Sequence, residues 1–226
     1  RVYELYRENI PVVGDQLLHG ISFDWEAHAT LLARWEDEKA GLLLELKEHF
    51  GDINFRSCKQ LSAWFRKNTS LQAMKKWPTT ANGHLSTSRE TLKDRGKING
   101  VKPLLQLKAV EKLVSSYGKG YIKHRHPVTG RLHPDVMIAG TAAGRFCASR
   151  PNVQNPPRLA EFRSLFSSRP GRALVAADFS QIELRCAALL SNDTNMKRSY
   201  EEGVDLHTTT AAALADTTPE LVTREQ

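Results

Sequence analysis

Apolar side chains recur at helical spacing along the first half of the chain. Between residues 25 and 50 they fall at Leu31, Leu32, Trp35, Leu42, Leu43, Leu46 and Phe50. This spacing places them on one face, which predicts a long amphipathic helix with one buried side. Asp24 stands immediately before the stretch and is a favourable N-cap, so we expect the helix to begin there.

Further segments of this half carry helix signals. Ser57 can cap a short helix, and Thr87 begins a capping-box pattern. Residues 101–123 again show apolar residues at helical spacing, and nearly all of their charged side chains are lysines. The intervening residues 67–86 are polar and contain proline, asparagine and glycine, which is typical of a loop. The first half is therefore predicted to be all-helical.

The second half has a different pattern. Residues 131–149 are rich in Val, Ile, Thr, Phe and Gly and predict a strand or hairpin, whereas three prolines in residues 150–158 exclude a helix there. Residues 173–177 are a continuous apolar run that ends at Asp178, the pattern of a buried strand with a carboxylate at its tip. Helical patterns return at 182–190, 195–202 and 206–214. Together the two halves predict an α+β fold.

Composition narrows the class of protein. A length of 226 residues allows one large domain or two small ones, and 40% hydrophobic and 25% charged residues are ordinary for a globular chain. No apolar run approaches the roughly 18 residues of a membrane span, and no signal peptide opens the chain. Three scattered cysteines exclude a disulfide scaffold and a four-cysteine zinc site. We expect a cytoplasmic protein without a membrane partner.

Charge is distributed unevenly. Residues 1–54 carry 5 basic and 11 acidic side chains, residues 55–125 carry 16 basic and 3 acidic, and residues 126–226 carry 11 of each. The central excess of +13 raises the local potential and attracts polyanions, of which nucleic acid is the usual soluble example. A lysine-rich helical surface that only confers solubility is the alternative.

Asp178 is the first candidate for chemistry. A carboxylate at the end of an apolar strand can bind Mg²⁺, which is usually held by one or two carboxylates together with substrate phosphates. An aspartate that caps the following turn fits the same position equally well. Glu183 can reach the same neighbourhood if the chain turns after Asp178, or can pair with Arg185 on the surface. Position alone favours the surface pair.

Two polar segments flank this aspartate. Arg145, Asn152 and Gln154 combine a rigid backbone with arginine and amide groups, which can contact bases and sugars in a minor groove. The alternative is a loop that bonds its own backbone. His207, near a predicted helix start, can contact phosphate with the help of the free N–H groups there. A histidine in this position is more often an ordinary surface residue.

The order of these segments resembles the polymerase region of family A DNA polymerases, the bacterial polymerase I type. Residues 178–185, Asp-Phe-Ser-Gln-Ile-Glu-Leu-Arg, are similar to motif A of that family. Residues 144–156 resemble the conserved stretch before motif A, and residues 205–208, Asp-Leu-His-Thr, resemble the stretch after it. Further matches lie upstream, at residues 19–24, 54–61, 83–88 and 112–117.

The resemblance implies roles for individual residues. Asp178 would be the catalytic aspartate that binds Mg²⁺, with the backbone carbonyl of Phe179 as a further ligand. Glu183 would be the steric gate against a ribose 2′-hydroxyl. The implied nucleotide-binding residues are Ser180, Gln181, Ile182, Glu183 and His207, the last of which would contact the incoming triphosphate. The implied DNA contacts are Arg145, Asn152, Gln154 and Asn155 near the primer terminus and Asn54, Ser57, Ser86, Thr87 and Lys112 along the backbone.

A domain order follows from the same resemblance. We expect a helical thumb at residues 1–125, the first part of a mixed-sheet palm at 126–192 and the start of helical fingers at 193–226. The expected partners are primer–template DNA and deoxynucleoside triphosphates, in a bacterial or phage-infected cell. Two departures from the family are visible, because Phe179 stands where the family usually has Tyr and Ala143 where it has Thr.

The expected activity is template-directed DNA synthesis by a two-metal mechanism. The family's main fingers helix and its His-Asp-Glu motif, which supplies the second metal-binding aspartate, have no counterpart in the sequence. Because a two-metal reaction needs carboxylates on both sides of the metals, we expect the isolated chain to be inactive and to work with a second polypeptide. The alternative function is a catalytically inactive fragment that binds primer–template DNA.

Overall fold

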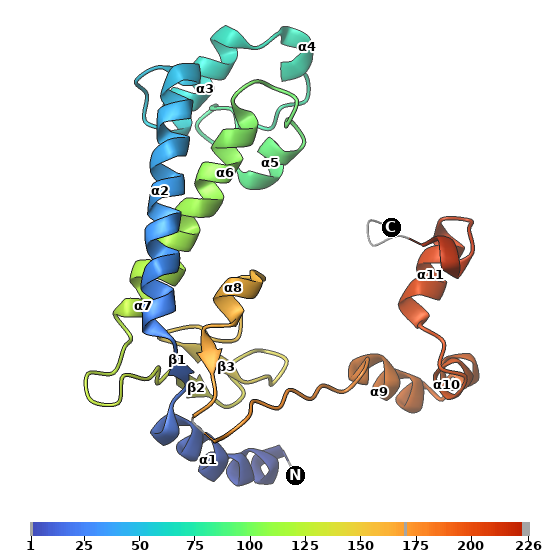
Figure 1. The fold of residues 1–226 in the computed structure, drawn as a ribbon. Helices are drawn as coiled ribbons and strands as arrows, with labels where there is room; N and C mark the ends of the chain where they lie inside the picture. Colours follow the sequence, from blue (N-terminus) through green and yellow to red (C-terminus); the bar gives the residue numbers. More distant parts are fainter. Residues whose placement is uncertain (1, 170, 223–226) are drawn as a thin grey trace. The chain divides into compact units, whose positions relative to one another are not determined.

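The computed structural model describes residues 2–169 and 171–222, which form two compact units divided between Leu174 and Val175 (Figure 1). The predicted thumb, palm and fingers boundaries stay predictions. The helices of the first unit are α1 (Val2–His19), α2 (Trp25–Phe50), α3 (Cys58–Asn68), α4 (Leu71–Met74), α5 (Arg89–Lys93), α6 (Val101–Lys112), the π-helix Leu113–Lys119, α7 (Gly120–Ile122) and α8 (Ala160–Arg163). No helix in the described part of the chain is both long and apolar enough for a membrane crossing.

Helix α2 spans the first unit and lies beside α6 (Figure 1). It begins as the sequence predicts, because the Asp24 side chain accepts a hydrogen bond of 3.0 Å from the N–H of Ala27. It ends where Gly51 takes a φ of +74°, a conformation that glycine adopts without strain. The predicted cap of α3 is confirmed, because Ser57 caps that helix. The predicted cap of α5 is off by one residue, since Ser88 and not Thr87 caps it.

The helix predicted over residues 101–123 is present, but its last part is wider than an α-helix. Residues Leu113–Lys119 form a π-helical segment between α6 and α7. A Cβ atom on Gly118 would lie 2.4 Å from Cδ1 of Leu32, so the glycine allows the segment to approach α2 closely. Single-turn π segments are often found at functional sites.

Two apolar cores pack against different parts of α2. The first lies among α2, α3, α5 and α6 and contains Leu46, Phe50, Phe55, Leu61, Phe65, Trp77, Leu85, Leu92, Val101, Leu104 and Leu107. The second contains Phe23, Leu31, Leu32, Trp35, Val110, Val114, Tyr121, Leu132, Phe162 and Leu165. Because α2 and α6 contribute to both cores, the two ends of the unit are held by the same pair of helices.

Phe162 is the centre of the second core. It is fully buried although α8 is only four residues long. Its ring lies 5.3 Å from that of Tyr121, 5.5 Å from that of Tyr117 and 6.1 Å from that of Trp35, between centroids. These separations are those of favourable aromatic pairs, so Phe162 connects α8 to both α2 and the π-helical segment.

The first unit has two small antiparallel sheets. Strand β1 (Ser22–Phe23) pairs with β4 (Phe166–Ser167), and β2 (Asp135–Met137) pairs with β3 (Cys147–Ser149). The hairpin predicted within residues 131–149 is thus confirmed. With its many helices and small sheets, the described chain is consistent with the predicted α+β class.

The buried strand predicted at residues 173–177 is wrong. These residues have no regular secondary structure and are exposed, and they are not part of either sheet in the described structure. A buried strand requires hydrogen-bonding neighbours and a cover on both faces, which an apolar run cannot supply by itself. The second unit contains α9 (Ile182–Ser191), α10 (Thr194–Glu201), α11 (Leu206–Leu214) and the 3₁₀-helix Pro219–Leu221, which confirms the three predicted helices.

Candidate nucleic-acid and nucleotide interface

The loop that follows β3 is held by the side chain of Gln154. Its Oε1 accepts a hydrogen bond of 2.9 Å from the N–H of Ala148, and its Nε2 donates to the carbonyl of Phe146 at 3.1 Å. The amide therefore bonds the chain's own backbone, as the alternative interpretation of this segment predicts. Arg145, just before it, is exposed, and its backbone N–H donates to Oγ1 of Thr141.

Asn152 and Asn155 are presented by the same loop, and both are exposed. Oδ1 of Asn152 accepts hydrogen bonds from the N–H groups of Gln154 and Asn155, at 3.1 and 3.2 Å. The hydroxyls of Tyr121 and Tyr117 donate to the carbonyls of Asn152 and Asn155, each at 3.1 Å. The two tyrosines thus fix the loop against the π-helical segment and α7.

Sequence reasoning missed the role of these tyrosines. The signal that could have found them is their spacing of four residues, which places both hydroxyls on one helical face. Burial, and to a smaller extent Tyr117, raise the pKa of Tyr121 to about 12. Tyr121 therefore keeps its proton, and with it the hydrogen bond to Asn152, throughout the neutral range.

A groove of about 300 Å³ lies between this loop and the helices. Lys112, Asn152 and Asn155 line it. Three residues that were predicted to contact DNA, from distant parts of the sequence, are thus found in the lining of one groove. His124 and Arg150 add to its basic lining, and no carboxylate of the described residues lines it. The charge of Arg150 is offset by an ion pair with Asp135, whereas the Lys112 side chain is exposed.

The upstream predicted DNA contacts lie at the ends of α3 and α5. Asn54 is exposed, and its Oδ1 accepts from the N–H of Arg56, while Ser57 caps α3. Ser86 is half-buried and accepts from the hydroxyl of Thr91 at 3.1 Å. Thr87 is only 9% exposed, which leaves little of its side chain for a phosphate contact. None of these four residues lines the groove at Lys112.

In the second unit Asp178 and Phe179 lie on the exposed segment before α9. Asp178 is exposed, and Phe179 keeps 78% of its surface accessible, which is unusual for a phenylalanine. Ile182 and Glu183 begin α9 and are exposed as well. The carboxylate of Asp178 is therefore solvated, but it does not stand at the tip of a buried strand as the sequence predicts.

Gln181 connects the start of α9 with the two helices that follow. It has a φ of +52°, a left-handed conformation that non-glycine residues adopt rarely. Its Nε2 donates to Oδ1 of Asp205 at 2.8 Å, and its Oε1 accepts from the Tyr200 hydroxyl at 3.2 Å. Arg185 donates from Nε to the carbonyl of Ser180 and lies 4.4 Å from the Tyr200 ring centroid. The residues after Asp178 are thereby held in one conformation.

His207 lies in the first turn of α11, which Asp205 caps. Oδ1 of Asp205 accepts from the His207 N–H at 3.1 Å, and Oδ2 accepts from the Thr208 hydroxyl at 2.7 Å. Hydrogen bonds from Thr208 first and Gln181 second hold the pKa of Asp205 below its ordinary value. His207 itself is exposed.

Replacing Thr208 with valine is expected to raise the pKa of Asp205 toward its ordinary value, because the first of its hydrogen bonds is lost. A lowered carboxyl pKa contributes stability above the unfolded-state pKa, and this contribution is lost as the pH falls through the folded-state pKa. The measurement is a carboxyl carbon NMR titration. Thr210→Val is the matched control, since the Thr210 hydroxyl donates to the Leu206 carbonyl instead. Equal titrations of Asp205 in both variants would contradict the assignment.

The described residues do not assemble a complete metal centre. No group of three or more His, Cys, Asp or Glu side chains in the described ranges is arranged to hold an ion. Asp178 fits the role of one oxygen ligand, and one carboxylate together with substrate phosphates is a known way to bind Mg²⁺.

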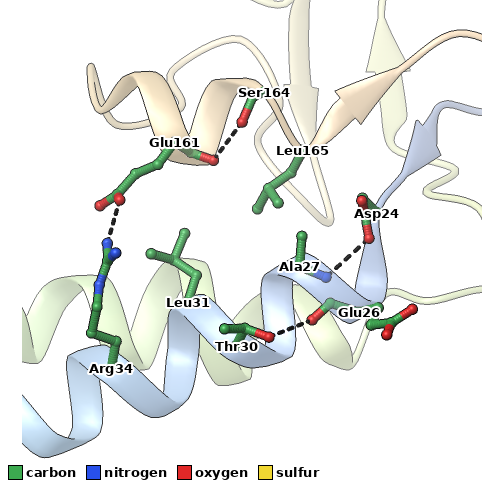
Figure 2. Close-up of a pocket in the computed structure, with 9 residues that line it drawn as sticks. All are labelled: Asp24, Glu26, Ala27, Thr30, Leu31, Arg34, Glu161, Ser164 and Leu165. Atoms are coloured by element: carbon green, nitrogen blue, oxygen red, sulfur yellow. Dashed lines mark hydrogen bonds and ion pairs between the residues drawn. The ribbon is translucent and has the colours of Figure 1, made fainter.

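A second groove, of about 540 Å³, has the opposite charge (Figure 2). It lies between the start of α2 and α8, and Asp24, Glu26 and Glu161 line it. The side chains of Arg34 and Glu161 reach toward one another and form an ion pair (Figure 2). With three carboxylates and one guanidinium in its lining, this groove is unsuited to bind phosphate. The ion pair of Arg34 with Glu161 connects α2 to α8.

Comparisons with known proteins place the chain in a family. The family model described as "DNA polymerase family A" matches residues 26–226. The chain is 34% identical over 221 residues to DNA polymerase I of Rhizobium leguminosarum, covering 94% of this chain and 22% of the relative. It is 36% identical over 224 residues to the thermostable DNA polymerase I of Thermus aquaticus, covering 94% and 26%.

A solved structure is similar over the same extent. It is the POL domain of Pol1 from M. smegmatis in complex with DNA primer-template and dNTP, with a TM-score of 0.78 and 25% identity, covering 94% of this chain and 38% of that one. The chain thus spans about a quarter of the length of the two relatives named above.

Proposed function

Because the chain belongs to DNA polymerase family A, we propose that residues 1–226 carry out part of template-directed DNA synthesis. They would form the thumb (1–125), the first part of the palm (126–192) and the start of the fingers (193–226). The reaction adds a deoxynucleotide from its triphosphate to the 3′-hydroxyl of a primer. The observation that carries the proposal is the groove that joins Lys112, Asn152 and Asn155 without a carboxylate among its described lining residues.

The first unit would bind the primer–template duplex. Lysine and arginine side chains of residues 55–125 neutralise phosphates without regard to sequence, which agrees with the excess of positive charge there. Asn152 and Arg145 would lie at the primer terminus, Asn152 on the loop that Gln154, Tyr117 and Tyr121 hold in place and Arg145 just before β3. In this proposal Gln154 acts mainly by positioning its neighbours, since its own amide is already bonded.

The second unit would bind the incoming nucleotide. The exposed Asp178 and the backbone carbonyl of Phe179 would be ligands of Mg²⁺, which supplies stabilisation of the charge that develops on the reacting phosphate. Glu183 would exclude the ribose 2′-hydroxyl, and His207 would bind the triphosphate. The hydrogen bonds of Gln181 to Asp205 and Tyr200 would keep these residues in a fixed relation within the unit.

A second aspartate is needed for the proposed two-metal site. Among the described residues, Asp178 is not part of any group of three or more His, Cys, Asp or Glu side chains arranged to hold an ion. We therefore propose that palm and fingers segments outside residues 1–226 complete the site, on the same polypeptide or on a second one. Residues 1–226 by themselves would then bind DNA without extending a primer.

Lys112→Gln is expected to weaken duplex binding. One phosphate contact is lost, so the slope of log K against log salt should become smaller in magnitude by about 1. The measurement is fluorescence anisotropy of a labelled primer–template over a series of salt concentrations. Lys47→Gln is the control, because it removes the same charge from the acidic residues 1–54, where Lys47 pairs with Asp52. Equal slopes for both variants would contradict the assignment of the groove.

The competing function is a DNA-binding module without chemistry. The lack of an assembled metal centre among the described residues is the observation in its favour. The two functions differ in their dependence on Asp178. DNA synthesis needs its carboxylate, whereas DNA binding alone does not.

A further inference from the structure

A second basic pocket lies beside the β1–β4 strand pair and has no part in the function proposed above. Its volume is about 450 Å³. Three arginines, Arg131, Arg169 and Arg172, line it together with serine hydroxyls, and no carboxylate among the described residues does so. It shares no lining residue with the groove at Lys112. The pocket is thus a separate concentration of positive charge in the first unit.

A tight turn places two of these arginines at the pocket. The N–H of Arg172 donates to the carbonyl of Arg169 at 3.0 Å, which closes the turn. Gly171, the third residue of this turn, has a φ of +72°, which glycine adopts without strain. The hydroxyl of Ser168 donates to the Arg172 carbonyl at 2.6 Å and stabilises the same turn. Both side chains are exposed and can reach a ligand.

Arg131 approaches the pocket from a different segment. Its Nη2 donates to Oγ of Ser22 at 3.0 Å, whereas its Nε is shielded from solvent and has no hydrogen-bond partner. A buried donor without a partner costs free energy, which no described residue recovers here. Burial first, and the charge of Arg169 second, lower the pKa of Arg131.

The positive charge of the pocket is not neutralised within the described residues. None of the three arginines forms an ion pair with a carboxylate in that part of the chain. Other arginines of the same unit are paired, such as Arg34 with Glu161 and Arg56 with Glu111. Three arginines that line one pocket without a counter-charge therefore distinguish it.

We propose that the pocket of Arg131, Arg169 and Arg172 binds a phosphate group. The planar guanidinium fork matches the spacing of two phosphate oxygens, and three such groups can compensate the double charge and several oxygens of a phosphate. The group comes from the backbone of a nucleic-acid strand or from a small phosphate anion. The proposal is independent of the role given to Asp178, since it rests on the first unit alone.

The test uses the 226-residue chain and two probes. Inorganic pyrophosphate is titrated by calorimetry, and a short labelled single-stranded oligonucleotide is followed by anisotropy. The double variant Arg169→Gln/Arg172→Gln is expected to lose at least roughly tenfold in affinity for the probe that occupies the pocket, because two charge-assisted contacts are removed. A loss for the oligonucleotide identifies a strand phosphate, and a loss for pyrophosphate alone identifies a small anion.

The control variant is Arg7→Gln/Arg198→Gln, which removes the same charge from exposed positions outside the pocket. Equal affinities of the two double variants for both probes would overturn the proposal. Thermal unfolding midpoints verify folding, and the single variant Arg172→Gln replaces the double variant if the latter does not fold.

Discussion

Asp178→Asn is expected to reduce primer extension by about a thousandfold in the assembly proposed above, in which residues 1–226 take part in DNA synthesis. The substitution keeps the size of the side chain and removes the negative charge that would hold Mg²⁺. Stabilisation of transition-state charge by a metal is worth several kcal/mol, and each 1.36 kcal/mol is a factor of ten in rate. The measurement is single-turnover incorporation of one deoxynucleotide into a labelled primer.

The same variant should bind primer–template DNA within about twofold of the unmodified protein, since the duplex contacts are proposed for the first unit. Asp216→Asn is the matched control, because Asp216 is an exposed aspartate of the second unit with a left-handed φ of +50°, which asparagine tolerates. Unchanged extension by Asp178→Asn would remove the proposed catalytic role. A loss of DNA binding in this variant would show that its effect is structural.

Phe162→Ala is expected to lower the free energy of unfolding of the first unit by about 3–5 kcal/mol. Phe162 is fully buried, and its ring contacts aromatic side chains from α2, the π-helical segment and α7. Because so many elements meet there, the surroundings cannot collapse easily into the space that the ring leaves. The measurement is urea unfolding followed by tryptophan fluorescence.

Phe179→Ala is the control for this experiment. It is the same substitution at a ring that is 78% exposed, so it should change the free energy of unfolding by less than about 0.5 kcal/mol. If Phe162→Ala cost no more than Phe179→Ala, the second core would not depend on α8.

The sequence predicts best the elements whose signal is local and repeated. Helix α2 has an apolar residue on one face in almost every turn and an aspartate that caps it, so its bounds could be read directly. The π-helical segment was not predicted, because the apolar spacing of residues 101–123 fits an ordinary helix, and the close approach of Gly118 to Leu32 is not visible in the sequence. The spacing of apolar residues shows which face of a helix is buried, but over so short a segment it does not distinguish an α-helix from a π-helix.

The apolar run at 173–177 shows the opposite limit. Five apolar residues predict burial, but burial needs neighbouring strands, and the described residues pair none with this run. For the candidate site, residue types and order could be read from the sequence. That Lys112 and Asn152 line the same groove could not be predicted, because it depends on the hydrogen bonds by which Tyr117 and Tyr121 hold the loop against the helices.

The continuity of α2 through both cores has a geometric consequence. At a rise of 1.5 Å per residue, its 26 residues make a rod of about 39 Å. One full turn of B-form DNA measures about 34–36 Å along its axis. Helix α2 alone is therefore slightly longer than one turn of the duplex, so the two cores at its ends lie within about one helical repeat of DNA from each other.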